Sequence, residues 1–147
     1  MSVNGKLCWT KSNLIGTAGT QLCGGIYREQ VFRVLGCHIT LPKAQKLTVN
    51  LWTTLDGDAA DESFGIDNVF VSKSLKYKSE FDKVDDFEGW NCGKITTCGN
   101  IQFCGGYNVK GAGSEIKKTF MVPPGKYSVE LDFIKIDSWY VCMCMCS

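Results

Sequence analysis

The segment Tyr127-Ser128-Val129-Glu130-Leu131 alternates apolar and polar residues, the pattern of a β-strand that buries one face. A matching segment, Leu47-Thr48-Val49-Asn50-Leu51, stands 80 residues earlier. Each follows a loop that contains proline, at Pro123 and Pro42 respectively. Matching strands in matching surroundings indicate an internal repeat, and this repeat decides the fold that we expect.

Other segments repeat in the same order and at nearly the same spacing. Three segments return 81 residues later: Cys23-Gly24-Gly25-Ile26-Tyr27 as Cys104-Gly105-Gly106-Tyr107, Ile39-Thr40-Leu41-Pro42 as Phe120-Met121-Val122-Pro123, and Leu55-Asp56-Gly57 as Ile136-Asp137-Ser138. Upstream, Cys8-Trp9 is echoed by Trp90-Asn91-Cys92. Because the matches keep one order at an almost constant offset, we infer two copies of one module of about 80 residues.

The local patterns are those of strands. Segments rich in β-branched and aromatic residues are separated by glycine and proline turns, and no helical periodicity is sustained. Asp132 and Lys135 lie between apolar neighbours, as polar residues do in half-buried strands. We therefore expect an all-β fold of two tandem small β-sandwich modules, jelly-roll-like and about 80 residues each.

The two copies differ in completeness. Copy 1 continues through Phe64–Val71, whereas the equivalent segment of copy 2 falls beyond Ser147. We expect repeat 1 over residues 1–75, a charged linker over 76–86, and an incomplete repeat 2, without its closing strand, over 87–147. Alternatively, the chain is cut from a longer array whose next residues complete copy 2.

Composition excludes several classes of function. The 147 residues include 16 Lys and Arg against 15 Asp and Glu, a net charge of +1, so we expect no nucleic-acid partner. The apolar runs are too short for a membrane span. The single histidine, His38, argues against general-base and zinc-hydrolase chemistry, and no phosphate-binding or nucleophile-elbow motif occurs. We expect a protein that is not an enzyme.

Nine cysteines favour an extracellular or cell-surface, disulfide-containing protein. The start, Met1–Lys6, is polar and is not a signal peptide, so the expected export signal lies outside this chain. The alternative is a reduced cytosolic protein with buried thiols.

The repeat suggests equivalent disulfides Cys8–Cys23 and Cys92–Cys104, since each pair flanks the same loop. The odd number of cysteines leaves at least one thiol free or bonded to another chain. In the tail 142–146, strand spacing places three cysteines on one face. They could hold a soft metal, or they could be disulfide partners of other cysteines.

A cluster of acidic residues is the candidate metal site. Five carboxylates fall within twelve residues: Asp56, Asp58, Asp61, Glu62 and Asp67. Calcium prefers such oxygen ligands in turn-rich loops, although the EF-hand pattern fails here because Ala60 and Asp61 stand at its fifth and sixth positions. Calcium is the cofactor we expect; the alternative is a polar loop whose aspartates form turns.

The four tryptophans are divided equally between the copies. Trp52 and Trp139 are the candidates for stacking on a sugar ring, a role that tryptophan and tyrosine play in carbohydrate-binding sandwiches. The alternative is that they belong to the core.

A family resemblance rests on several of these motifs. The segment Asp61–Val69 resembles the E-x-[FW]-G-[IV]-D-N-[VI] ending of extracellular jelly-roll modules. Together with Phe87-Glu88-Gly89-Trp90, Cys104–Tyr107 and Ile136–Trp139, it is similar to tandem cysteine-rich repeats of ciliate-type protist surface proteins, and more loosely to MAM-like and galactose-binding-like modules. The resemblance implies an extracellular β-sandwich with calcium at the acidic loop and without catalysis. The family's Asp-x-x-Glu after Ser-Trp is absent here.

These observations favour a non-enzymatic structural module that self-assembles into a surface fibre, coat or matrix. Copy 2, without its closing strand, is expected to leave a sheet edge open to a second copy of the chain. The first alternative is a calcium-assisted module that binds carbohydrate or protein in adhesion. The second is a soft-metal or redox protein that uses the cysteine tail.

Overall fold

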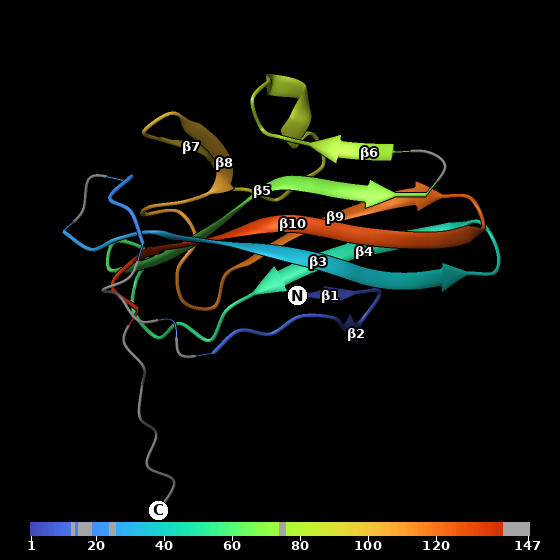
Figure 1. The fold of residues 1–147 in the computed structure, drawn as a ribbon, viewed down its shortest axis with the longest axis horizontal. Coiled ribbons are helices and arrows are strands. Elements are labelled where there is room, and N and C mark those ends of the chain that lie inside the picture. Colours follow the sequence, from blue (N-terminus) through green and yellow to red (C-terminus); the bar gives the residue numbers. More distant parts are fainter. Residues whose placement is uncertain (13, 15–18, 24–25, 74–75, 140–147) are drawn as a thin grey trace, which may run out of the picture.

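Two β-sheets pack face to face in the computed structural model, which describes residues 1–12, 14, 19–23, 26–73 and 76–139 (Figure 1). The smaller sheet has the order β2-β1-β4-β9 and contains β1 (Ser2–Val3), β2 (Lys6–Leu7), β4 (Gln45–Trp52) and β9 (Glu115–Val122). The larger has the order β3-β10-β5-β8-β7 and contains β3 (Gln30–Leu41), β10 (Gly125–Asp137), β5 (Glu62–Ser72), β8 (Ile101–Gly105) and β7 (Ile95–Cys98). The expected all-β class is confirmed.

The expected linker is not a free connection. Residues 76–79 form strand β6 (Lys76–Ser79), which pairs with β5, and a short 3₁₀ helix (Val84–Phe87) follows it. This segment therefore belongs to the larger sheet and its border.

The two halves of the chain interlock instead of forming the two tandem modules that we expected. Strand β4 of the first half pairs along its whole length with β9 of the second, and β3 pairs with β10. Within residues 87–147, the only described strands that pair with each other are β7 and β8. Neither half alone supplies all the hydrogen-bonded neighbours of its strands, because β3, β9 and β10 have their partners in the other half.

The sequence repeat is visible in the fold, because the β3–β10 pair of one sheet corresponds to the β9–β4 pair of the other. Leu41 lies opposite Gly125 in the larger sheet, and Val122 lies opposite Gln45 in the smaller one. Leu41 and Val122 are equivalent at the offset of 81, and Gln45 and Gly125 at the offset of 80. Of the two repeated strands in each copy, one therefore lies in each sheet: β3 pairs with β10, and β4 pairs with β9.

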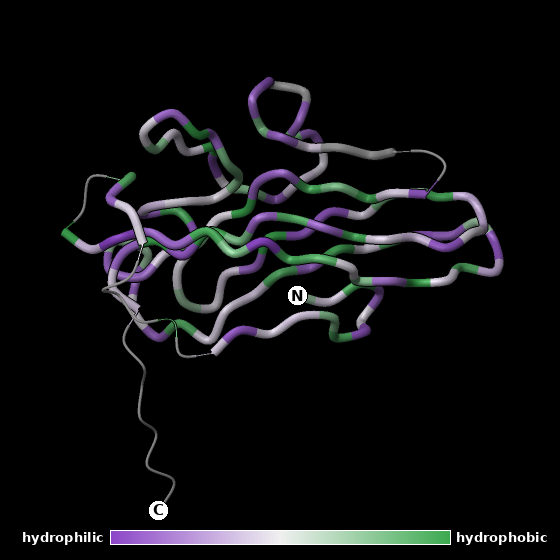
Figure 2. Tube along the Cα trace, in the orientation of Figure 1, coloured by the Kyte–Doolittle hydropathy of each residue, from purple (hydrophilic) through white to green (hydrophobic). Residues whose placement is uncertain are grey.

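The apolar residues of the alternating segments form part of the core. Leu47, Val49 and Leu51 of β4 are buried, as are Val129 and Leu131 of β10. Figure 2 shows hydrophobic and hydrophilic residues alternating along the strands. Burial of this kind is worth about 1.5–3 kcal/mol for each large aliphatic side chain.

The disulfides differ in part from those expected. Cys92 bonds to Cys104, as the repeat predicts. The expected Cys8–Cys23 bond is wrong, because Cys8, which follows β2, bonds to Cys37 of β3, and Cys23 bonds to Cys98 at the end of β7. The Cα atoms of the two pairs are 5.4 and 4.7 Å apart.

Disulfides within the described residues indicate an oxidising environment, as outside the cell. The cysteines at 142, 144 and 146 lie outside the described residues. In the part of the chain that the structure describes, no helix is long and apolar enough to cross a membrane.

Interlocking predicts that the halves fold only together. When residues 1–75 and 87–147 are produced separately, we expect each fragment to be unfolded by circular dichroism and amide exchange, since β3, β9 and β10 lack their partners. The two fragments mixed under oxidising conditions should regain the strand signal. A folded, monomeric 87–147 fragment would contradict the observed pairing.

Candidate functional site

An aromatic pocket of about 200 Å³ opens where β4 ends, between the N-terminal segment and the end of β10. We call it the tryptophan pocket; its lining residues are Met1, Leu7, Trp9, Thr10, Lys11, Leu14, Trp52, Thr53, Thr54, Phe133 and Trp139. Both tryptophans that the sequence selects for stacking, Trp52 and Trp139, lie in this lining.

Three aromatic rings form a fixed cluster in the pocket. The ring centroid of Phe133 lies 5.4 Å from that of Trp9 and 5.9 Å from that of Trp139. The Trp139 indole Nε1 donates to the carbonyl oxygens of Ser63, at 3.0 Å, and Ile136, at 3.1 Å. Because its polar edge is held by the backbone, Trp139 presents a ring whose orientation is set before any ligand arrives.

The rim of the pocket is more exposed. Trp52 is 45% exposed and Leu7 is 58% exposed, so two apolar residues of the lining are accessible to solvent. Thr10, Lys11 and Thr54 are exposed residues of the same lining, and their side chains carry two hydroxyls and one ammonium. The pocket therefore combines an accessible aromatic face with polar groups that give direction to binding.

Sequence reasoning missed the contribution of Trp9 and Phe133. In the sequence, Trp9 stood out only as part of the repeat and as one of the four tryptophans, and Phe133 was not singled out. The pairing of strands between the two halves, which we call the strand exchange, places Phe133 of β10 against Trp9 of the first half.

The acidic segment does not form one cluster. The Asp58 carboxylate Oδ1 accepts from the Ala60 N–H at 2.9 Å, and the Asp58 carbonyl accepts from the N–H groups of Asp61 and Glu62. The Glu62 carboxylate is buried and accepts from the Gly57 N–H at 3.1 Å. These contacts are those of a turn that satisfies its own backbone.

The remaining carboxylates point to different places. Asp61 Oδ1 accepts from the Ser138 hydroxyl at 2.7 Å. Asp56 and Asp58 line an open basin with Ser114, separate from the tryptophan pocket. Among the described residues, no group of three or more His, Cys, Asp or Glu side chains is arranged to hold a metal ion. Calcium binding by this segment stays a prediction.

Asp67 lies away from the loop, in β5 beside Asp132 of β10. Its carboxylate accepts from the Asn68 N–H at 2.7 Å, and Asn68 Nδ2 donates to Asp132 at 2.8 Å. Burial raises the pKa of Asp67 from 3.8 to about 6; the Asn68 hydrogen bond opposes this rise, and the Asp132 charge adds to it.

A buried lysine lies near the C-terminal end of β10, where the sequence led us to expect a half-buried polar residue. The Lys135 side chain is fully buried, and its Nζ donates to the carbonyl oxygens of Asp137, at 2.5 Å, and Arg28, at 3.3 Å. Burial lowers the pKa of Lys135, whereas the charges of three buried carboxylates raise it: Glu29, Asp137 and Glu62. Lys135 is thus a buried cation that donates to two backbone carbonyls.

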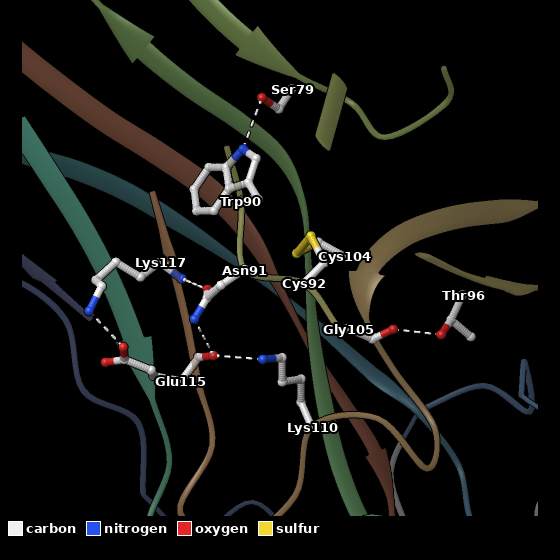
Figure 3. Close-up of a disulfide and its surroundings, with 10 residues drawn as sticks. All are labelled: Ser79, Trp90, Asn91, Cys92, Thr96, Cys104, Gly105, Lys110, Glu115 and Lys117. Carbon is white, nitrogen blue, oxygen red and sulfur yellow. Dashed lines mark hydrogen bonds and ion pairs between the residues drawn. A yellow bond between two sulfur atoms is a disulfide. The ribbon is translucent and has the colours of Figure 1, made fainter. Parts of the chain in front are cut away.

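The edge strand β9 is capped by an amide (Figure 3). The Asn91 N–H donates to the Lys117 carbonyl at 3.2 Å, the Asn91 side-chain oxygen accepts from the Lys117 N–H, and its Nδ2 donates to the Glu115 carbonyl. The disulfide Cys92–Cys104 holds this segment against β8. At the start of β9, Asn91 thereby occupies backbone groups of Glu115 and Lys117 that a neighbouring strand would use.

No protein-family model, curated protein or solved structure matches this chain. The candidate function therefore rests on the residues and geometry described above.

Replacement of the buried Lys135 should destabilise the fold. We expect Lys135→Met to lower the free energy of unfolding by about 1–3 kcal/mol, because the carbonyls of Asp137 and Arg28 lose their donor. Lys126→Met, at an exposed position of the same strand, should change it by less than about 0.5 kcal/mol. Urea unfolding of both variants measures the difference, and equal stability would refute the role of Lys135.

Asp67 should make stability depend on pH. Its pKa is higher in the folded chain than in the unfolded chain, so the folded state holds the proton more tightly, and this stabilisation is lost as pH rises from about 4 through 6. We expect the unfolding free energy of the wild type, measured relative to Asp67→Asn, to fall over this window. Parallel curves for the two proteins between pH 4 and pH 7.5 would contradict the assignment.

Proposed function

We propose that this protein is a non-enzymatic extracellular binding module whose ligand is a carbohydrate held in the tryptophan pocket. The single observation that carries the proposal is that Trp52, which is 45% exposed, lines the same pocket as the aromatic cluster of Trp9, Phe133 and Trp139. A sugar presents an apolar face that packs on such rings and hydroxyls that bond to polar groups around them.

The dimensions suit one sugar ring. The pocket, at about 200 Å³, is smaller than the roughly 300–1,000 Å³ of sites for drug-sized ligands. The hydroxyls of Thr10 and Thr54 are exposed at its edge, where each can donate and accept a hydrogen bond. A terminal residue of a glycan chain fits this arrangement better than an extended polymer does.

The described lining favours binding over catalysis. It contains no carboxylate, histidine or cysteine side chain, the groups that most often supply acids, bases and nucleophiles. The disulfides, and the resemblance to surface-protein and galactose-binding-like modules, support an extracellular setting for such a binding module.

Self-assembly into a fibre, coat or matrix has less support. It was expected from an open edge in the second copy, but β10 lies between β3 and β5 and is paired on both sides. The β9 edge is capped by Asn91, and β3 carries an irregularity opposite Glu130 that interrupts its ladder. Bulges and capped edges are features that prevent pairing between sheets.

Trp52→Ala tests the binding function. On a panel of immobilised glycans followed by titration calorimetry, we expect the wild type to bind at least one saccharide and Trp52→Ala to weaken that binding about tenfold or more. Trp52→Phe should retain part of the affinity. Met121→Ala removes another exposed apolar side chain, on β9, and should leave binding unchanged.

Melting temperatures of the three variants establish that the fold is intact. The proposal fails if no saccharide on the panel binds, or if Trp52→Ala binds as tightly as the wild type.

A further inference from the structure

The charged side chains that line the tryptophan pocket are of one sign. Lys11 is the one charged side chain among its described lining residues. The acidic residues nearest in sequence to Trp52 face other surroundings, since Asp56 and Asp58 line the separate basin. The described lining of the pocket therefore contains one positively charged side chain and no negatively charged one.

Lys11 is held in place without being neutralised. Its Nζ lies 5.5 Å from the ring centroid of Phe32, in β3, within the range of a cation–π contact. Among the described residues, no carboxylate lies within ion-pair distance of Lys11. An aromatic face orients an ammonium but leaves its full charge, so Lys11 remains available to an anion.

The polar groups at the rim suit the same ligand. Thr10 precedes Lys11 directly, and Thr54 lies in the same lining, so two hydroxyls and the ammonium share one opening. The aromatic part of the lining, from Trp52 to Trp9, provides the surface for a sugar ring.

We propose that the ligand is an anionic saccharide, whose ring packs on Trp52 and whose carboxylate or sulfate pairs with Lys11. This inference rests on the proposed function and adds the class of the sugar. An exposed ion pair of this kind is weak, so the acidic sugar should bind roughly two- to fivefold more tightly than its neutral counterpart. The preference should shrink at high salt, where exposed charges are screened.

The experiment compares matched sugars on the intact chain. A panel of disaccharides is tested in sets of three: a neutral hexose form, the form with a hexuronic acid in its place, and the O-sulfated form. Titration calorimetry at 50 mM and 500 mM NaCl gives the affinities. The variants are Lys11→Met, Lys11→Arg and Lys43→Met, in which Lys43 is an exposed lysine just before the opposite end of β4.

We expect the wild type and Lys43→Met to prefer an acidic form at low salt. Lys11→Arg should keep this preference, and Lys11→Met should lose it while still binding the neutral form. A preference for the uronate identifies a carboxylate ligand, and a preference for the sulfated form identifies a sulfate ligand.

Three results would overturn the inference. Equal binding of neutral and acidic forms, or a preference that Lys11→Met retains, refutes the role of Lys11 but leaves the pocket as a neutral-sugar site. Absence of binding by every member of the panel refutes the proposed function itself, and with it this inference.

Discussion

Strand β10 is the element on which the rest of the structure depends. It is hydrogen-bonded to β3 on one side and to β5 on the other, and both neighbours come from the first half of the chain. Its side chains reach the core through Val129 and Leu131 and reach the pocket through Phe133. Without β10, the larger sheet separates into an unpaired β3 and the strands around β5, so one strand joins fold, core and site.

The sequence predicts the strands but not their partners. Alternation identified Leu47–Leu51 and Tyr127–Leu131 because period-two burial is a local property that each segment displays by itself. Whether a repeated strand pairs within its own copy or with the other copy depends on long-range contacts that leave no local mark. The Cys8–Cys23 expectation failed because Cys23 bonds to Cys98 of the other half, whereas Cys8 bonds to Cys37 of its own half.

The candidate site was predictable to a similar degree. Trp52 and Trp139 were selected by residue type, and both lie in one pocket. Phe133 and Trp9 could not be placed beside them before the strand exchange was known. Lys135 shows a different limit of sequence-based prediction. A lysine between two isoleucines is typical of a half-buried strand, in which the lysine faces solvent. Here Ile134, Lys135 and Ile136 are all buried, so both faces of the sheet are covered at this point.

The two copies of the repeat differ at the position that Trp52 occupies. At the offset of 80 that relates β4 to β10, Trp52 corresponds to Asp132, and Thr53 corresponds to Phe133. Asp132 is engaged by Arg33, at 3.1 Å, and by Asn68, so the equivalent position carries an ionic contact where the pocket carries an indole. Thr53 and Phe133 are themselves equivalent and line the same pocket. The pocket therefore lies where the two copies meet, and its specificity comes from the positions at which their sequences have become different.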